Sequence, residues 1–182
     1  MQFKLALLIP SLKSREAFLS RLQAILKPQL TDKIVALVDI DEGQASIGAK
    51  RNRLVEMADA EYVAFIDDDD MVSNDYIQLM MEGIDKGVDA VCVQQIITFD
   101  GKAPKLVIDS PYQEADFRDN IYYRGAQHLD AIKKEIAVQI KYPDKSFGED
   151  ADYTKALADS KLIKTWHNIN KPVYFYQYRS KK

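Results

Sequence analysis

The feature that most constrains the fold of this 182-residue chain is an apolar run that ends in four consecutive aspartates. Residues 62–66 are small, aromatic or β-branched, which is typical of a buried strand. Asp67 to Asp70 follow directly, and their like charges repel one another wherever water is partly excluded. Aspartate favours turns and helix N-caps, but only one residue can cap a helix. The run therefore predicts a bound cation, and ligands that are all oxygen favour Mg²⁺ or Mn²⁺.

The segments around this run alternate between apolar strands and amphipathic helices. Strands are expected at 3–9, 34–38 and 62–66, and helices at 14–28, 46–58 and 74–86. Ser14 is the expected N-cap of the first helix, and Pro10 is expected to end the first strand. This alternation predicts an α/β fold, with a mostly parallel, mixed sheet between helices. Ligands of such sheets bind beyond the carboxyl ends of the strands, where Pro10-Ser11 and two acidic segments, 39–42 and 67–70, are expected.

The second half of the chain has a less regular pattern. Strands are expected at 88–93, 94–99 and 105–108, with a turn at Asp100-Gly101. Ile132, Ile136 and Ile140 have helical spacing and predict a helix that begins at Asp130. A further helix is expected at about 149–159, followed by strands at 162–166 and 173–178. No linker or repeat divides the sequence, so we expect a single domain over residues 1–182.

Composition excludes several classes of protein. Apolar residues make up 47 % of the chain and charged residues 29 %, which is ordinary for a soluble globular protein. The net charge of −3 argues against non-specific binding of nucleic acid. The single cysteine, Cys92, excludes an internal disulfide and is expected in the core. The apolar run at 5–9 is too short to span a bilayer, which predicts a cytoplasmic protein, and the basic segment 179–182 suits only a peripheral contact with a membrane.

Charged residues at the starts of two predicted helices are candidates for the chemistry. Arg51 falls within the apolar stripe of the helix at 46–58, so it needs an anionic partner, either a nearby aspartate or a bound phosphate. Gly48, at the start of that helix, allows a phosphate to approach the backbone closely. Glu149 and Asp150 follow Gly148, and one of them could serve as a general base. His128 precedes a predicted helix and is a candidate for the acceptor site.

Five short motifs occur in an order that resembles the family 2 glycosyltransferases of GT-A fold. They are Leu8-Ile9-Pro10-Ser11, Ala36-Leu37-Val38-Asp39, Gly48-Ala49-Lys50-Arg51-Asn52, Phe65-Ile66-Asp67-Asp68-Asp69-Asp70 and Phe147-Gly148-Glu149-Asp150. The resemblance covers residues 3 to about 158, and 174–179 resembles the family's end strand, which is rich in tyrosine and arginine. It implies a Rossmann-like GT-A domain with a nucleotide-sugar half at 1–97 and an acceptor half at 98–182.

The resemblance also implies roles for individual residues. Pro10 and Ser11 would border the nucleoside pocket, Asp39 would contact the base, and Arg51 would lie near the base or the diphosphate. Residues 67–69 would be the DxD motif: Asp69 would bind Mn²⁺ or Mg²⁺, Asp67 would lie near the ribose or sugar and the metal, and Asp68 would lie beside the donor. Lys50 and Arg179 would add positive potential. Asp150 would be the catalytic base, and Glu149 could exchange roles with it.

These implications predict a metal-dependent, inverting transferase that uses a nucleotide-diphosphate sugar, with UDP-sugar as the expected donor. The acceptor hydroxyl could belong to a glycan, a lipid-linked saccharide, a protein or a modified nucleic-acid base. The turn after the second strand, Asp39-Ile40-Asp41-Glu42-Gly43, departs from the family's Asp-Asp-Gly-Ser type. Two alternatives are a nucleotidyltransferase, whose usual glycine-rich loop is missing at 10–15, and a non-catalytic module that binds nucleotide sugars.

Overall fold

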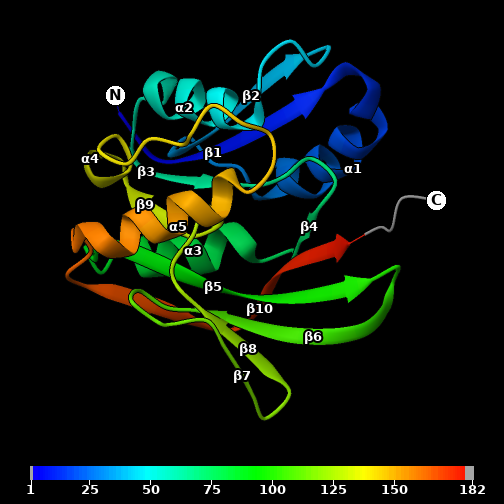
Figure 1. The fold of residues 1–182 in the computed structure, drawn as a ribbon. Coiled ribbons are helices and arrows are strands. Elements are labelled where there is room, and N and C mark those ends of the chain that lie inside the picture. The colour runs from blue at the N-terminus through cyan, green and yellow to red at the C-terminus, as the bar shows by residue number, and fades with distance from the viewer. Residues whose placement is uncertain (1, 179–182) are drawn as a thin grey trace.

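The apolar strands of the first half form a parallel sheet at the centre of the molecule. In the computed structural model, which describes residues 2–178, strands β1 (Phe3–Leu12), β2 (Ile34–Asp41) and β3 (Ala60–Phe65) lie in the order β2-β1-β3 (Figure 1). Leu8 of β1 lies opposite Leu37 of β2 on one side and Phe65 of β3 on the other. Since the strands are parallel, their carboxyl ends meet at one edge of the sheet.

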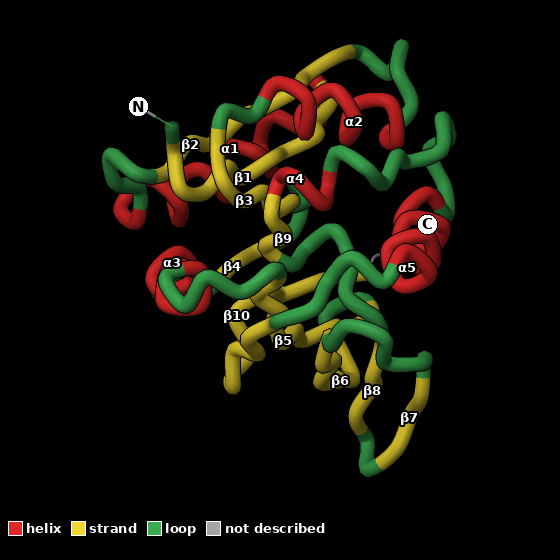
Figure 2. Tube along the Cα trace, turned by 90° about the vertical axis from the view of Figure 1, so that its left-hand side faces the viewer, coloured by secondary structure: helices red, strands yellow, loops and turns green. Residues whose placement is uncertain are grey.

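Helices cover both faces of this sheet, as the alternating pattern predicts (Figures 1 and 2). One face of β1 presents Leu5, Leu7 and Ile9 to α1 (Glu16–Leu26) and α3 (Tyr76–Ile84). The other face presents Ala6 and Leu8 to α2 (Ile47–Met57), α4 (Lys134–Ala137) and α5 (Glu149–Ser160). Alternate side chains of β1 therefore pack into two separate apolar cores. Two short 3₁₀ helices, η1 (Lys13–Arg15) and η2 (Lys27–Gln29), flank α1.

The second half of the chain extends the sheet with mixed strand directions. Strand β9 (Ala131–Lys133) lies antiparallel between β3 and β5 (Ala90–Phe99), and β6 (Lys102–Asp109) is antiparallel to β5. The outer strands are β8 (Ile121–Arg124) and β7 (Asp116–Arg118). Strand β10 (Trp166–Tyr178) runs parallel to β5 and pairs with the short strand β4 (Met71–Val72). The prediction of an α/β fold with a mixed central sheet is confirmed.

The helix predicted to begin at Asp130 is wrong. Residues 131–133 form strand β9 instead, and α4 covers only 134–137. Ile132 lies opposite both Val63 of β3 and Ala90 of β5, so it fills the middle of the sheet. The spacing of Ile132 and Ile136 suits a helix equally well, but sheet pairing overrides that local pattern.

Three predicted boundaries near strand and helix ends also differ. Strand β1 continues through Pro10 to Leu12, because β3 ends opposite Leu8 and leaves one side of β1 open beyond it. Ser14 lies in η1 and makes no capping bond to α1, which begins at Glu16. The two strands predicted at 162–166 and 173–178 are one strand, β10, with irregular register around Pro172. Among residues 2–178, no helix is both long and apolar enough to cross a membrane.

Candidate active site

The four aspartates form a turn at the end of β3, and their side chains divide into two pairs. The backbone N–H of Asp70 donates to the carbonyl of Asp67 at 3.1 Å, which closes the turn. Asp68 and Asp70 are buried, whereas the side chains of Asp67 and Asp69 are 30 % and 29 % exposed. All four border a cleft, but Asp68 and Asp70 are also held by hydrogen bonds from other parts of the protein.

Hydrogen bonds from two other strands hold the buried pair. Ser11 Oγ, on β1, donates to Asp68 Oδ2 at 2.6 Å. Tyr174, on β10, donates from its hydroxyl to Asp70 Oδ2 at 2.7 Å and accepts from the backbone N–H of Asp67 at 3.1 Å. Both Asp68 and Asp70 therefore stabilise the turn. The resemblance implied that Ser11 and Asp68 lie beside the donor, and in the structure these two side chains bind each other.

Three basic side chains surround the acid turn. The buried Arg51 lies with Nη2 3.0 Å from Asp67 Oδ1 and 3.7 Å from Glu149 Oε1, and its guanidinium is 5.2 Å from the ring centroid of Phe65. This confirms the prediction that Arg51 needs an anionic partner. Lys50 Nζ donates to the Ser11 carbonyl at 2.5 Å and pairs with Asp41. This pair and two backbone N–H groups that donate to Asp41 lower the pKa of Asp41 to about 2.

Arg15, the third basic residue, is one that the sequence analysis did not propose for the site. Its Nη2 lies 3.1 Å from Asp68 Oδ1 and also pairs with Asp69. A signal in the sequence could have identified Arg15: it is a basic residue in the loop that follows a strand whose carboxyl end lies at the site. Arg15 therefore joins Lys50 and Arg51 as a source of positive potential at the acid turn.

Burial and crowding move the pKa values of the acid turn in opposite directions. Burial opposes ionisation of Asp67, but the charges of Arg51 and Arg15 and the neighbouring His128 together outweigh it and hold the pKa of Asp67 below its ordinary value. Burial and the charge of Asp67 raise the pKa of Asp70 to about 8, and burial raises the pKa of Asp68. The four carboxyl groups of the turn therefore exceed the negative charge that the nearby basic side chains readily neutralise, which favours binding of a further cation.

The residues at the acid turn fit a hard divalent ion as a partial ligand set. All four aspartates border the cleft, and the two more exposed ones, Asp67 and Asp69, supply only oxygen, as Mg²⁺ and Mn²⁺ prefer. Oδ1 of Asp70 is buried and accepts no hydrogen bond from the described residues, and Oδ1 of Asp68 has the ion pair with Arg15 as its contact. No group of three His, Cys, Asp or Glu side chains within residues 2–178 could hold a metal ion unaided. The oxygens of a bound diphosphate and of water would have to complete the set.

The opposite wall of the cleft is the start of α5. Gly148 has a φ of 74°, a left-handed conformation that glycine adopts without strain, and Glu149 and Asp150 follow it in the first helical turn. Glu149 is buried beside Arg51, and burial raises its pKa. Asp150 borders the cleft and accepts a hydrogen bond from the N–H of Ala151 at 2.8 Å. Of the two carboxylates, Asp150 is therefore the one that is not buried beside Arg51.

The N-terminus of α2 does not present its backbone to a phosphate, contrary to the expectation for Gly48. The N–H of Gly48 donates to the carbonyl of Lys145 at 3.1 Å, and Ser46 caps the helix. A Cβ on Gly48 would lie 1.9 Å from the carbonyl oxygen of Pro143. Glycine is therefore needed because the loop before α5 packs directly on α2, and this contact places Asp150 opposite the acid turn.

His128 lies between the two walls. Its Nε2 is 3.7 Å from Asp67 Oδ2, and neither ring nitrogen makes a hydrogen bond within the described residues. Burial and the charge of Arg51 lower the pKa of His128 to about 4, so the imidazole is neutral at pH 7. The structure therefore brings this acceptor-site candidate next to the acid turn.

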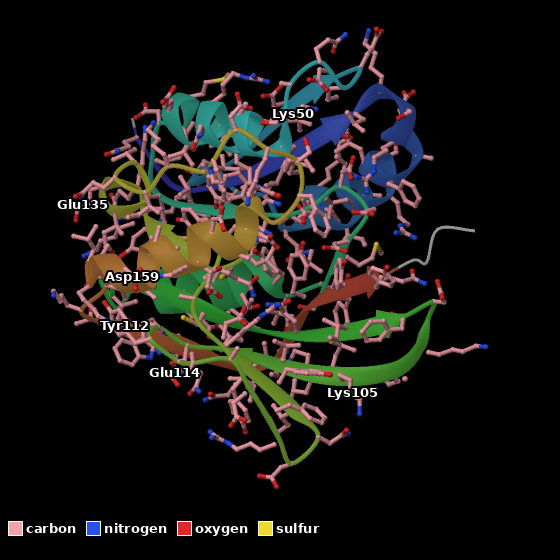
Figure 3. All side chains as sticks on the ribbon, viewed as in Figure 1. Lys50, Lys105, Tyr112, Glu114, Glu135 and Asp159 are labelled. Carbon is pink, nitrogen blue, oxygen red and sulfur yellow. The ribbon has the colours of Figure 1, made fainter. Side chains whose placement is uncertain are left out.

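The cleft between these walls has a volume of about 860 Å³, which is in the range of small-molecule sites. It brings together all the predicted site residues except two. Asp39 does not border it and instead pairs with Arg53 at 2.8 Å, and Arg179 lies outside the described residues. Lys50, labelled in Figure 3, reaches the cleft from α2. Bordering residues that the sequence analysis did not propose include Arg15, Gln95, Arg124, Gln127, Phe147 and Tyr176.

The fold agrees with comparisons to known proteins. The model of the family described as Glycosyl transferase family 2 matches residues 14–141. The chain therefore belongs to glycosyl transferase family 2. No curated protein sequence matches it.

Solved structures of S. aureus TarS have the same fold. TarS 1–349 in complex with UDP-GlcNAc superposes with a TM-score of 0.70 at 15 % identity, over 99 % of this chain and 60 % of that one. TarS 1–349 in complex with UDP gives a TM-score of 0.69 at 16 % identity, over 96 % of this chain and 60 % of that one. The chain thus spans about 60 % of the length of these structures.

Proposed function

We propose that this protein transfers a sugar from a UDP-sugar to an acceptor hydroxyl, with inversion at the anomeric carbon and with the help of Mn²⁺ or Mg²⁺. One observation carries the proposal: a single cleft is lined by the acid turn, by the basic residues Arg15, Lys50 and Arg51, and by Asp150. The choice of UDP is supported by the similarity of the fold to TarS in its complexes with UDP-GlcNAc and UDP.

The donor binds at the acid turn in this proposal. Arg15, Lys50 and Arg51 provide positive potential for the diphosphate, and Pro10 and Ser11 border the nucleoside. Asp69 and Asp67 would hold the metal ion, which when bound supplies Lewis-acid neutralisation of the charge on the departing UDP. Burial makes these charges more effective than they would be in water, because less solvent screens them.

The acceptor enters from the side of α5, and residues 98–182 form its half of the site. Asp150 accepts the proton of the acceptor hydroxyl as its oxygen bonds to the anomeric carbon and the bond from that carbon to UDP breaks. A single displacement of this kind needs one base and forms no covalent sugar–enzyme intermediate, unlike retaining hydrolysis. Glu149, buried against Arg51, holds that arginine in place beside Asp67.

A thermal-shift panel of nucleotide sugars, each with and without Mn²⁺, tests the donor side. A ligand near 100 times its Kd adds about 2.7 kcal/mol to the apparent stability, so the correct UDP-sugar raises Tm by several degrees. We expect a larger shift when Mn²⁺ is present, and a smaller Mn²⁺ effect in Asp69→Asn. No shift with any nucleotide sugar would contradict the proposal.

A further inference from the structure

The sheet face that leads away from the cleft carries exposed aromatic side chains. Val107 of β6 lies opposite Gln95 of β5 and Tyr122 of β8, and Tyr122 lies opposite Phe117 of β7. Residues directly opposite each other share a face, so these four side chains form one row. Phe117 and Tyr122 are 49 % and 37 % exposed, and their ring centroids are 4.4 Å apart. They offer an aromatic surface to solvent.

A positioned arginine stands on the same face, between this aromatic surface and the cleft. Arg124 donates from Nε to Asp109 Oδ1 at 2.9 Å and from Nη2 to Gln95 Oε1 at 2.6 Å. Asp109 is buried and also accepts from Gln95 at 2.5 Å and from Gln127 at 2.7 Å, so it is fixed from several sides. Nη1 of Arg124 makes no hydrogen bond within residues 2–178, and the side chain is 36 % exposed. Its remaining donors can serve a ligand.

The aromatic surface borders a pocket of about 400 Å³, which we call the β7–β8 pocket. Its lining consists of Ile97, Val107, Ala115, Asp116, Phe117, Tyr122, Tyr123 and Arg124. Arg124 borders both this pocket and the 860 Å³ cleft, so the two adjoin at this residue. Lys105, labelled on β6 in Figure 3, lies with Nζ 5.4 Å from the ring centroid of Phe117. The pocket is therefore a mainly apolar, aromatic site with one cation, Arg124, in its lining and a second, Lys105, beside one of its rings.

We propose that the β7–β8 pocket binds a saccharide acceptor, holding the sugar units next to the one that reacts. A sugar ring has an apolar C–H face that packs on an aromatic ring and a rim of hydroxyls that accept hydrogen bonds from an arginine. The pocket offers both kinds of contact, and its continuity with the cleft lets one chain of sugars reach both. This inference rests on the proposed function and narrows the acceptor classes to a glycan chain.

The double variant Phe117→Ala/Tyr122→Ala tests the pocket, with Trp166→Ala as the matched control. Trp166 is 42 % exposed on β10 and borders neither the pocket nor the cleft. UDP release from UDP-GlcNAc is measured with chitotetraose, cellotetraose or maltotetraose and, separately, with water as the only acceptor. Loss of two aromatic contacts should raise the KM for the tetrasaccharide about tenfold or more. The rate of hydrolysis should stay within about twofold of wild type because neither residue borders the cleft.

Saturation-transfer NMR of the same tetrasaccharides without donor gives a second readout that does not depend on turnover. Wild type and Trp166→Ala should transfer saturation to one of them, and the double variant should transfer much less. An unchanged KM, equal saturation in the double variant, or binding of none of the three saccharides to wild type would overturn the inference. Saturation in wild type without any hydrolysis of a UDP-sugar would instead count against the proposed transferase.

Discussion

At the scale of single residues, the site depends on two carboxylates with different surroundings at the start of α5. Glu149 is buried and faces Arg51, whereas Asp150 borders the cleft. If Asp150 is the base, Asp150→Asn should lower kcat for transfer by about 10² to 10⁴-fold. The Kd for UDP, measured by calorimetry, should remain within about twofold, because Asp150 does not belong to the acid turn.

Asp152→Asn is the matched control for this prediction. Asp152 lies in the same helical turn, but its side chain is 58 % exposed and pairs with Lys145. Its amide variant should keep wild-type kcat. Full turnover in Asp150→Asn, with UDP bound normally, would show that the base has been assigned to the wrong residue.

Two arginines on α2 provide a second residue-scale comparison. Arg51 is buried between Asp67 and Glu149, and its loss would leave the buried Glu149 carboxylate without its partner, at a cost of about 3 kcal/mol. Arg53 pairs with Asp39 at the surface, where such a pair contributes about 1 kcal/mol or less. In urea unfolding at pH 7, Arg51→Met should therefore lose much more stability than Arg53→Met. Equal losses would mean that Arg51 is not a structural ion-pair partner.

At the scale of elements, Asp89 links three strands. It immediately precedes β5, and its carboxylate binds β9 and the residues just before β10. Oδ1 accepts from Lys133 Nζ at 2.9 Å, and Oδ2 accepts from the backbone N–H groups of Lys164 and Thr165 at 2.8 and 3.0 Å. Burial opposes ionisation of Asp89, but these donors outweigh it and lower its pKa to about 2. The carboxylate thus ties together strands whose order could not be read from the sequence.

The lowered pKa of Asp89 has a definite consequence for stability against pH. The folded pKa of about 2 is below the model-peptide value of 3.8, so the stabilisation is present above about pH 4 and is lost as pH falls towards 2. At pH 7, Asp89→Asn should lose roughly 1–2 kcal/mol of unfolding free energy. The difference from wild type should shrink between pH 5 and pH 3 in urea titrations. A difference independent of pH would show that the charge of Asp89 is not what stabilises these strands.

The sequence predicted some elements better than others for physical reasons. Strands 3–9, 34–38 and 62–66 were found because each is a continuous apolar run between helices, and that pattern is local. Strand β9 was missed because three residues, 131–133, carry too little pattern, and their strand conformation depends on pairing with β3 and β5. The β7–β8 hairpin was missed likewise, since its strands are short, β7 is exposed, and β8 depends on pairing with β6.

At the scale of the whole molecule, most of the site residues expected from the sequence line one cleft, because three strand ends meet at one edge of the sheet. The acid turn and Asp150 face one cleft, although about 80 residues of sequence separate them (67–70 to 150). Sequence reasoning did not find Arg15, Gln95 or Arg124, whose side chains are positioned by contacts that no local pattern reveals. Gly48 was predicted to allow a phosphate to approach the backbone, but it allows the loop before α5 to pack on α2 instead.

The most direct test of the central claim is to follow a UDP-sugar by proton NMR with this protein, an acceptor and Mn²⁺. The account predicts that the anomeric signal of the donor disappears, that UDP forms, and that the product has the opposite anomeric configuration. Removal of the metal with a chelator should slow this reaction strongly. The account would be contradicted if no nucleotide sugar were consumed while UTP and a sugar 1-phosphate gave pyrophosphate, which is the reaction of a nucleotidyltransferase.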